Sequence, residues 1–328
     1  MTFPWLVADV GGTNARFSLV TAEDGSGFQF EHTQTLPTAG YLRFEDCLQA
    51  YLAQLPAALS KSVCAGCIAM AGPVVGDQVS FTNLDWHLSR SALQQQLGWN
   101  QLCLLNDFAA LACSMPHLAD ADMQPLLPGT VVPRAAKAIV GPGTGLGVAA
   151  LVYTPVGWWP VPGEGGFTAY APQSPRELAV AALLQPRMYL YTEALVSGGG
   201  LVLTYNSLAE IDGLAERASE AAEVVDLALQ QQQPLALEAL QMFCDSLGTA
   251  VGSAALLYGA KGGIYLGGGI VPRIADFLVR TGFEKRLRER GRQTAFMADI
   301  PVFLITHPYP AFLGAAAWLQ QQLVNANG

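Results

Sequence analysis

Apolar residues recur at a helical spacing in segment 41–55. They stand at positions 44, 47, 48, 51, 52 and 55, the 3.6-residue period of a helix with one face on a core. Short apolar runs at Trp5–Ala8, Ala15–Val20 and Cys64–Met70 have the length and composition of buried strands. Strands first, then alternating helix and strand, predict an α/β sheet of mixed strand direction.

A similar hairpin opens the second half of the chain. The pair Gly12-Thr13 recurs as Gly143-Thr144, and strands are expected on both sides of the second pair, at Ala138–Val140 and Val148–Val152. Two hairpins of one design indicate two related halves.

The remainder of the second half alternates between glycine-rich and apolar segments. We expect a Gly-, Pro- and Trp-rich loop at Gly157–Gly166, a long helix at Leu235–Gly259, a strand, turn and helix at Gly262–Arg273, a last strand at Val302–Ile305 and a final helix at Ala311–Leu323. No segment has the composition of a flexible linker, so the two lobes are expected to meet along a cleft, where ligands commonly bind.

Composition agrees with a two-domain globular protein. The chain has 328 residues, of which 51% are hydrophobic and 13% charged, so it has enough apolar material for a core and is not intrinsically disordered. The 34 Gly and 20 Pro show no repeat, which predicts many tight turns and excludes a collagen-like chain.

Charge argues against nucleic acid and anionic membrane as partners, because the net charge is -9. The densest basic run, 285–292, alternates with Glu and is interpreted as a solvated helix face. No apolar run is expected to reach bilayer-spanning length, and the N-terminus has no basic segment typical of a secretory signal.

The six cysteines fit a reducing cytosol, because the chain is too long to need disulfides. Cys64 and Cys67 form a C-x-x-C inside an apolar run, without a second pair or nearby His, and are interpreted as small core residues rather than zinc ligands. The four histidines show no metal-ligand spacing and no adjacent nucleophile motif.

Two glycine-rich turns have the features of phosphate-binding loops. In Asp9-Val-Gly-Gly-Thr-Asn14, paired glycines allow close approach of the backbone to an anion and Thr13 adds a hydroxyl. Gly141-Pro-Gly-Thr-Gly-Leu-Gly147 repeats this arrangement. Asp9 would repel a phosphate unless Mg²⁺ lies between them, directly or through water. The alternative is two ordinary hairpins with an Asp that caps a turn.

Neither common nucleotide fingerprint is present. The chain contains no G-x-x-x-x-G-K-[ST], and its glycine turns do not fit G-x-G-x-x-G between a strand and a helix. A P-loop NTPase and a Rossmann dehydrogenase are therefore disfavoured.

Carboxylates and amides provide the remaining candidate chemistry. Asn106 and Asp107 lie where an apolar strand meets a helix expected at 108–115, so Asp107 either caps the helix or accepts a proton from a substrate hydroxyl. Glu164, Glu193 and Asn83 lie in loops of a chain poor in charge, where they either stabilise turns or bind neighbouring hydroxyls of a polyhydroxylated ligand.

With these motifs in order, the chain resembles the bacterial glucokinases, ATP:glucose phosphotransferases of the hexokinase/actin-like superfamily. The resemblance runs from Val7 to about Gly314 and includes Asp9–Arg16 as the first phosphate loop, Gly141–Gly147 as the second and Leu266–Arg273 as the segment near adenosine.

The resemblance implies a site residue by residue. ATP would be bound by Ala8, Asp9, Val10, Gly11, Gly12, Thr13, Asn14, Gly143, Thr144, Gly145 and Gly268, and glucose by Asn83, Asn106, Asp107, Glu164 and Glu193. Asp107 corresponds to the catalytic base that activates the sugar 6-hydroxyl, and Asp9 would position Mg²⁺, through water.

One position departs from the family pattern. After Pro-Gly-Glu-Gly-Gly the family usually has a His that hydrogen-bonds a sugar hydroxyl, whereas this chain has Phe167. Two alternatives to a glucose kinase follow from the sequence: a kinase for another hexose or an amino sugar, and a non-catalytic sugar sensor.

The resemblance also implies the architecture and setting. We expect two ribonuclease-H-like lobes with mixed sheets, the smaller at 1–117 with the C-terminal helix 308–328 returning to it, and the larger at 118–307. The lobes would close around the sugar and exclude water. Family members are cytoplasmic, catalyse the first step of glycolysis and are often homodimers.

Overall fold

The computed structural model describes residues 2–25, 27–81, 84 and 86–327. The chain forms two compact units. Unit 1 comprises Met1–Ala119, Thr154–Pro160 and His307–Gly328, and unit 2 comprises Asp120–Tyr153 and Val161–Thr306.

Unit 1 is built on a five-stranded mixed sheet. In spatial order its strands are β3 (Gly27–Pro37), β2 (Asn14–Asp24), β1 (Trp5–Val10), β4 (Ala65–Met70) and β8 (Gln101–Asn106). The first three are antiparallel, whereas β1, β4 and β8 are parallel. β4 is buried along its whole length, as its continuous apolar sequence predicts.

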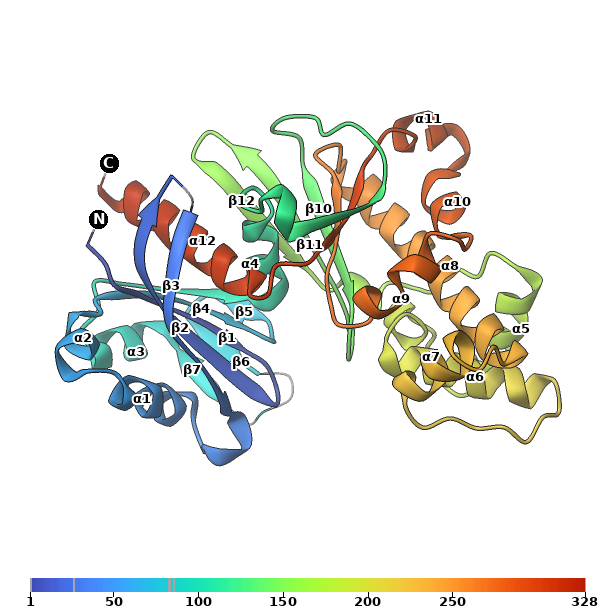
Figure 1. Ribbon diagram of the computed structural model, residues 1–328, viewed down its shortest axis with the longest axis horizontal. Coiled ribbons are helices and arrows are strands. Elements are labelled where there is room, and N and C mark those ends of the chain that lie inside the picture. Colours follow the sequence, from blue (N-terminus) through green and yellow to red (C-terminus); the bar gives the residue numbers. More distant parts are fainter. Residues whose placement is uncertain (1, 26, 82–83, 85, 328) are drawn as a thin grey trace. The chain divides into compact units, whose positions relative to one another are not determined.

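Helices cover both faces of this sheet (Figure 1). The helices of unit 1 are η1 (Thr38–Gly40), α1 (Phe44–Gln54), α2 (Ala57–Ser62), α3 (Arg90–Leu97), α4 (Asp107–Ser114) and α12 (Pro310–Asn327). On one face Phe44 and Tyr51 of α1 pack against Phe17 of β2. On the other, α12 packs on β1, β4 and α4. The helix expected at 41–55 is thus confirmed, and a small sheet of β5 (Val74–Val75), β6 (Gln78–Ser80) and β7 (His87–Ser89) follows β4.

Unit 2 repeats the strand order of unit 1 and adds one strand. Its sheet consists of β12 (Gly157–Gly163), β11 (Leu146–Thr154), β10 (Lys137–Pro142), β13 (Ile264–Leu266), β14 (Val302–Ile305) and β9 (Met123–Leu127). Residues 154–160, at the end of β11 and the start of β12, belong to unit 1. As in unit 1, an antiparallel hairpin leads into parallel strands, here β10, β13 and β14. The short sequence echo between the two glycine hairpins therefore extends to topology.

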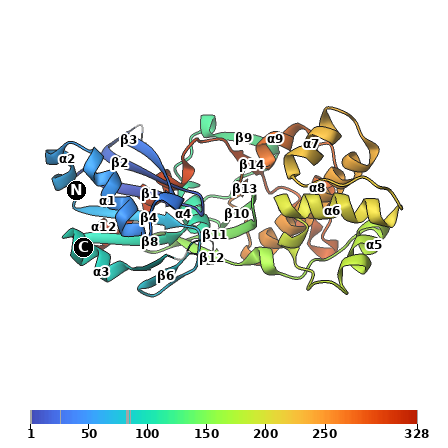
Figure 2. The same cartoon turned by 90° about the horizontal axis from the view of Figure 1, so that it is seen from below.

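The long helix α8 is the centre of the unit 2 helical layer. The helices of unit 2 are η2 (Asp120–Asp122), η3 (Gly165–Phe167), α5 (Pro175–Leu184), η4 (Thr192–Ala194), α6 (Gly198–Ile211), α7 (Ala221–Leu229), α8 (Pro234–Tyr258), α9 (Val271–Leu278), α10 (Phe283–Arg288), η5 (Gly291–Gln293) and α11 (Thr294–Met297). α6 and α7 pack on α8 (Figure 2), and α10 packs on it as well (Figure 1). Among the described residues, α8 alone is long and apolar enough to span a bilayer, contrary to the expectation that no apolar run reaches that length, but its apolar window is 61% buried within the protein. This burial fits a core helix.

The loop expected at 157–166 is wrong in its first part, because residues 157–163 form strand β12. Pro160 and Pro162 cannot donate hydrogen bonds to a neighbouring strand, but β12 lies at the edge of the sheet, where only one side is paired. Trp159 packs edge-on against Trp318 of α12, with ring centroids 4.9 Å apart. The strand thus pairs with the preceding strand β11 and packs on a residue distant in sequence, Trp318.

The basic run also differs from its interpretation as a solvated helix face. Arg286 pairs with the buried carboxylate of Glu177, with N and O 3.0 Å apart. Arg288 donates to the carbonyls of Met297 and Ile300, and Arg290 donates to the Thr249 carbonyl at 2.6 Å. Arg286, Arg288 and Arg290 therefore connect segments of unit 2.

Candidate functional site

In unit 1, three parallel strands end at one edge and bring separate motifs together. Val10 of β1 is in register with Met70 of β4, and Met70 with Asn106 of β8. The Ala71 N–H donates to the Val10 carbonyl at 2.9 Å, and the Asn106 amide donates to the Gly72 carbonyl at 3.3 Å. The first glycine turn and the Asn106-Asp107 pair therefore lie at the carboxyl ends of β1 and β8, which flank β4, at the usual ligand-binding edge of an α/β sheet.

Asn106 is the N-cap residue of α4. Its side-chain oxygen accepts hydrogen bonds from the N–H groups of Phe108 and Ala109, at 3.0 and 3.2 Å. Asp107 lies one residue further on, partly buried in the first turn of α4, and its Oδ1 accepts from the Phe108 N–H at 2.9 Å. The positive end of the helix dipole stabilises a negative charge in this turn, and the Asp107 carboxylate lies there, beside the strand edge.

The first glycine turn is fixed by backbone contacts and by one threonine. The Gly11 N–H donates to the Asn14 carbonyl at 2.9 Å, closing the turn. Thr38, which is buried, donates its hydroxyl to the Gly12 carbonyl at 2.8 Å and its N–H to the Thr13 carbonyl at 3.0 Å. Sequence reasoning missed Thr38, because nothing in its local sequence indicates a contact with the turn.

Asp9 and Arg16 face each other across the first hairpin. They are register partners on β1 and β2, and Arg16 Nη1 lies 3.1 Å from Asp9 Oδ2. Burial raises the pKa of Asp9, while the Arg16 guanidinium lowers it. The side chains of Ala8 and Val10, which flank Asp9, are packed in the unit 1 core.

Asp9 fits one kind of metal site. Among the described residues, no group of three or more His, Cys, Asp or Glu could enclose an ion. Mg²⁺ usually binds through one or two carboxylates together with substrate phosphates and water. A single carboxylate beside a glycine turn is consistent with that donor set.

In unit 2, the second glycine turn lies at the ends of β10 and β13. The Gly143 N–H donates to the Gly145 carbonyl at 2.8 Å, and the Gly198 N–H, at the start of α6, donates to the Gly143 carbonyl at 2.8 Å. Gly268 has a φ of +79°, and a Cβ there would lie 2.4 Å from the Pro142 carbonyl oxygen. Gly268 is therefore required by its backbone conformation and by its close approach to β10, and it lies beside the same strand end as the turn.

The turns that carry Glu164 and Glu193 are joined by two threonines. Thr192 donates both its N–H and its hydroxyl to the Thr168 carbonyl, at 2.8 and 3.0 Å, and the two hydroxyls lie 3.2 Å apart. Glu164 is exposed. The Glu193 carboxylate is partly buried and accepts from the Leu146 N–H at 2.6 Å. Unit 2 thus brings both predicted sugar-binding glutamates close to the second turn.

Phe167, at the position of the usual His, is exposed. Its ring is 55% exposed and stacks on Tyr191, with centroids 5.0 Å apart and planes at 16°. Its N–H donates to the Glu164 carbonyl at 3.0 Å. The ring therefore lies in the Glu164 turn itself, where it can cover a ligand but cannot hydrogen-bond it.

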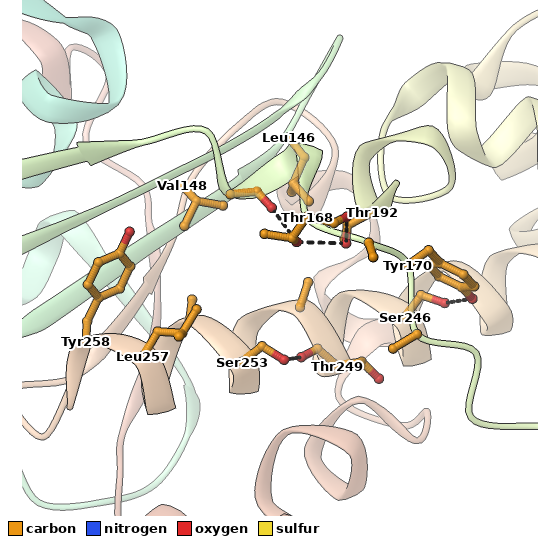
Figure 3. Close-up of a pocket in the computed structure, with 15 residues that line it drawn as sticks. Leu146, Val148, Thr168, Tyr170, Thr192, Ser246, Thr249, Ser253, Leu257 and Tyr258 are labelled. Atoms are coloured by element: carbon orange, nitrogen blue, oxygen red, sulfur yellow. Dashed lines mark hydrogen bonds between the residues drawn. The ribbon is translucent and has the colours of Figure 1, made fainter. Parts of the chain in front are cut away.

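A cavity of about 90 Å³ lies between this turn and α8 (Figure 3). Its wall combines apolar atoms with the hydroxyls of Thr168, Thr192, Tyr170, Ser246 and Ser253. Tyr170 and Ser246 hydrogen-bond each other across it at 2.8 Å. None of the predicted sugar-binding side chains described by the structure lines this cavity.

The predicted site residues thus fall into two groups, one in each unit. Asp9, the first turn, Asn106 and Asp107 are brought together in unit 1; the second turn, Gly268 and Glu193 in unit 2, with Glu164 in the adjoining turn. Asn83 lies outside the described residues. The threonines that fix the turns, Thr38, Thr168 and Thr192, escaped sequence reasoning because hydroxyl side chains are common in any loop.

Known proteins resemble the chain over nearly its whole length. A family model described as Glucokinase matches residues 6–322. The glucokinase of Saccharophagus degradans is 41% identical over 320 residues, which cover 97% of this chain and 99% of that protein. The glucokinase of Chromobacterium violaceum is 42% identical over 322 residues, covering 98% and 90%. A crystal structure of a glucokinase from an Antarctic psychrotroph has a TM-score of 0.88 at 35% identity, covering 98% of this chain and 99% of that one.

Proposed function

Because this chain belongs to the glucokinase family, we propose that it transfers the γ-phosphoryl group of ATP to the 6-hydroxyl of glucose. The observation that carries the proposal is the edge of the unit 1 sheet. There the first glycine turn follows β1 and the carboxylate of Asp107 follows β8, two parallel strands that end at the same edge with β4 between them. The similarity to proteins named glucokinase favours glucose over another hexose or an amino sugar, and an enzyme over a sensor.

Asp107 acts on the sugar hydroxyl. It orients the 6-hydroxyl and accepts its proton as the oxygen attacks the γ-phosphorus. The transition state of phosphoryl transfer is loose and needs little covalent assistance, so positioning and charge account for most of the rate enhancement. Asn106 supports this step by capping α4, which fixes the turn that carries Asp107.

Amide and carboxylate groups hold the sugar. Glu164 and Glu193 accept hydrogen bonds from ring hydroxyls, with Asn106 and Asn83 as further partners. Phe167 supplies apolar contact in place of a hydrogen bond. If a sugar hydroxyl beside Phe167 had no hydrogen-bond partner, sugar binding would weaken by about 1–3 kcal/mol, unless a water molecule made the hydrogen bond.

The two glycine turns bind the phosphates. The N–H groups of Gly11 and Gly143 close their own turns, so the anion would be bound by other backbone N–H groups of 11–14 and 143–145. Gly268 forms part of the segment near adenosine. Asp9 would hold Mg²⁺, which neutralises phosphate charge when bound.

Further expectations of the resemblance complete the proposal. Units 1 and 2 act as the smaller and larger lobes, and the enzyme is a cytoplasmic homodimer at the entry of glucose into glycolysis. Sedimentation equilibrium of the purified chain tests the dimer.

Substitution of Asp107 tests the catalytic assignment. Asp107→Asn keeps the size of the side chain and removes its basicity, so kcat should fall by roughly 10²–10⁴-fold while glucose binding measured by calorimetry persists. Asp46→Asn is the matched control, because Asp46 also lies in the first turn of a helix, α1, where it is partly exposed and pairs with Arg43 away from the predicted site residues. Near wild-type turnover in Asp107→Asn would remove Asp107 from the role of base.

A further inference from the structure

The Glu193 carboxylate lies against the second glycine turn. Its Oε2 accepts a hydrogen bond from the Leu146 N–H at 2.6 Å, a short distance for an N–H···O bond, as charge assistance produces. Glu193 itself is carried by η4, 47 residues further along the chain. The turn between β10 and β11 therefore contacts a predicted sugar-binding group as well as forming a predicted phosphate loop.

The glycines of this turn differ in what surrounds them. A Cβ built on Gly143 has no atom within 4 Å, so space does not require glycine there. A Cβ built on Gly145 would lie 2.5 Å from Glu193 Oε2 and 3.1 Å from its carboxyl carbon. The volume that a side chain at 145 would fill is thus occupied by the Glu193 carboxylate.

Gly166 bounds the same carboxylate on another side. A Cβ on Gly166 would lie 3.2 Å from Glu193 Oε2, but also 2.5 Å from the Leu146 carbonyl oxygen. Substitution at Gly166 would therefore displace backbone. At Gly145 the close atoms are the far end of a single flexible side chain, so an added methyl group can be accommodated by moving Glu193 alone.

We propose that Gly145 is a positioning residue for the sugar site. Because glycine has no side chain, the Glu193 carboxylate can occupy the space beside residue 145, where the neighbouring Leu146 N–H holds it in one orientation. This inference rests on the proposed function, in which Glu193 binds glucose. With Oε2 committed to Leu146, Oε1 is the oxygen available to a sugar hydroxyl. Gly145 then serves glucose rather than ATP, although it belongs to a phosphate-type loop.

Steady-state kinetics of Gly145→Ala separate the two roles. Displacing a carboxylate that makes charged hydrogen bonds should raise KM for glucose by about tenfold to a hundredfold, with KM for ATP changed less than about twofold. Gly199→Ala is the matched control, because a Cβ there has no atom within 4 Å and the residue lies in the first turn of α6. A rise in KM for ATP with an unchanged KM for glucose would overturn the proposal.

A double-mutant cycle tests the same contact without relying on activity. Apart from the Glu193 carboxylate, no atom lies closer than 3.6 Å to a Cβ at 145. Gly145→Ala should therefore leave stability unchanged in a Glu193→Ala background. If Gly145→Ala destabilises or unfolds both backgrounds equally, Glu193 is not what requires glycine, and the proposal fails. Absence of glucose phosphorylation by the wild type would instead count against the proposed function, and the cycle on urea unfolding would still report on the contact.

Discussion

Two opposing effects act on the pKa of Asp9, and they can be separated by experiment. Burial is the larger effect and raises the pKa of Asp9 above its usual value, and the neighbouring Arg16 guanidinium offsets part of this rise. Asp9, Asp107 and Thr38 show which residues near the site can be predicted from the sequence. Asp9 and Asp107 belong to contiguous motifs and were found from the sequence, whereas the contacts of Thr38 with the first turn join segments far apart and could not be.

Removal of Arg16 should therefore make the reaction more sensitive to acid. In Arg16→Ala the pKa of Asp9 rises, because the lowering contribution is lost while burial remains. The acid limb of the pH profile of kcat/KM for ATP should move to higher pH. In Arg16→Lys, which keeps the positive charge, the acid limb should lie closer to its position in the wild type. If the limb stays in place in Arg16→Ala, ionisation of Asp9 does not limit the reaction.

At the scale of elements, the backbones of α4 and α12 come into direct contact at Gly314, where no side chain separates them. A Cβ on Gly314 of α12 would lie 1.7 Å from the Ala110 carbonyl oxygen of α4. Helices with apolar periodicity were predictable from sequence because the pattern is local. β12 was not, because its Gly, Pro and Trp residues are those of a loop and its pairing partner and Trp318 decide its conformation. The contacts of the partly buried Arg286, Arg288 and Arg290 with other segments were missed for the same reason.

Substitution of Gly314 tests this helix contact. Gly314→Ala should lower the free energy of unfolding by about 3 kcal/mol, the upper end of the usual cost of overpacking, because backbone cannot move aside as a flexible side chain can. Urea denaturation provides the measurement. Gly40→Ala, where a Cβ has no atom within 4 Å, should stay within about 0.5 kcal/mol of the wild type. Equal stability of the two variants would contradict the close contact.

At the scale of the whole molecule, the fold class is confirmed: both units contain mixed sheets, and the structural similarity to a glucokinase spans the chain. The strand order of unit 1 recurs in unit 2, which the sequence indicated only through two short hairpins.

Unit 2 also contains a buried lysine, Lys137, whose ammonium donates to the Gly262 carbonyl at 3.0 Å and to the Tyr265 hydroxyl at 2.8 Å. Burial lowers the pKa of Lys137 to about 8.

This lysine should give the stability of the protein a characteristic pH dependence. An unfolded lysine titrates near pH 10.4, so between about pH 8 and 10 the unfolded chain binds more protons than the folded one. Stability contributed by this position therefore rises with pH, by at most about 1.4 kcal/mol per pH unit. The free energy of unfolding of the wild type minus that of Lys137→Met, from urea denaturation, should increase over this window. A difference that is flat or falls with pH would contradict the effect of burial.

The measurement that tests the central claim most directly is a coupled assay of ATP-dependent phosphorylation. It compares glucose, mannose, fructose, glucosamine and N-acetylglucosamine, with the wild type and with Phe167→His. We predict that glucose has the highest kcat/KM with the wild type, and that Phe167→His lowers KM for glucose by restoring a hydrogen-bonding group. Turnover that is fastest on another sugar, or no turnover of any sugar despite binding by calorimetry, would contradict the assignment as a glucose kinase.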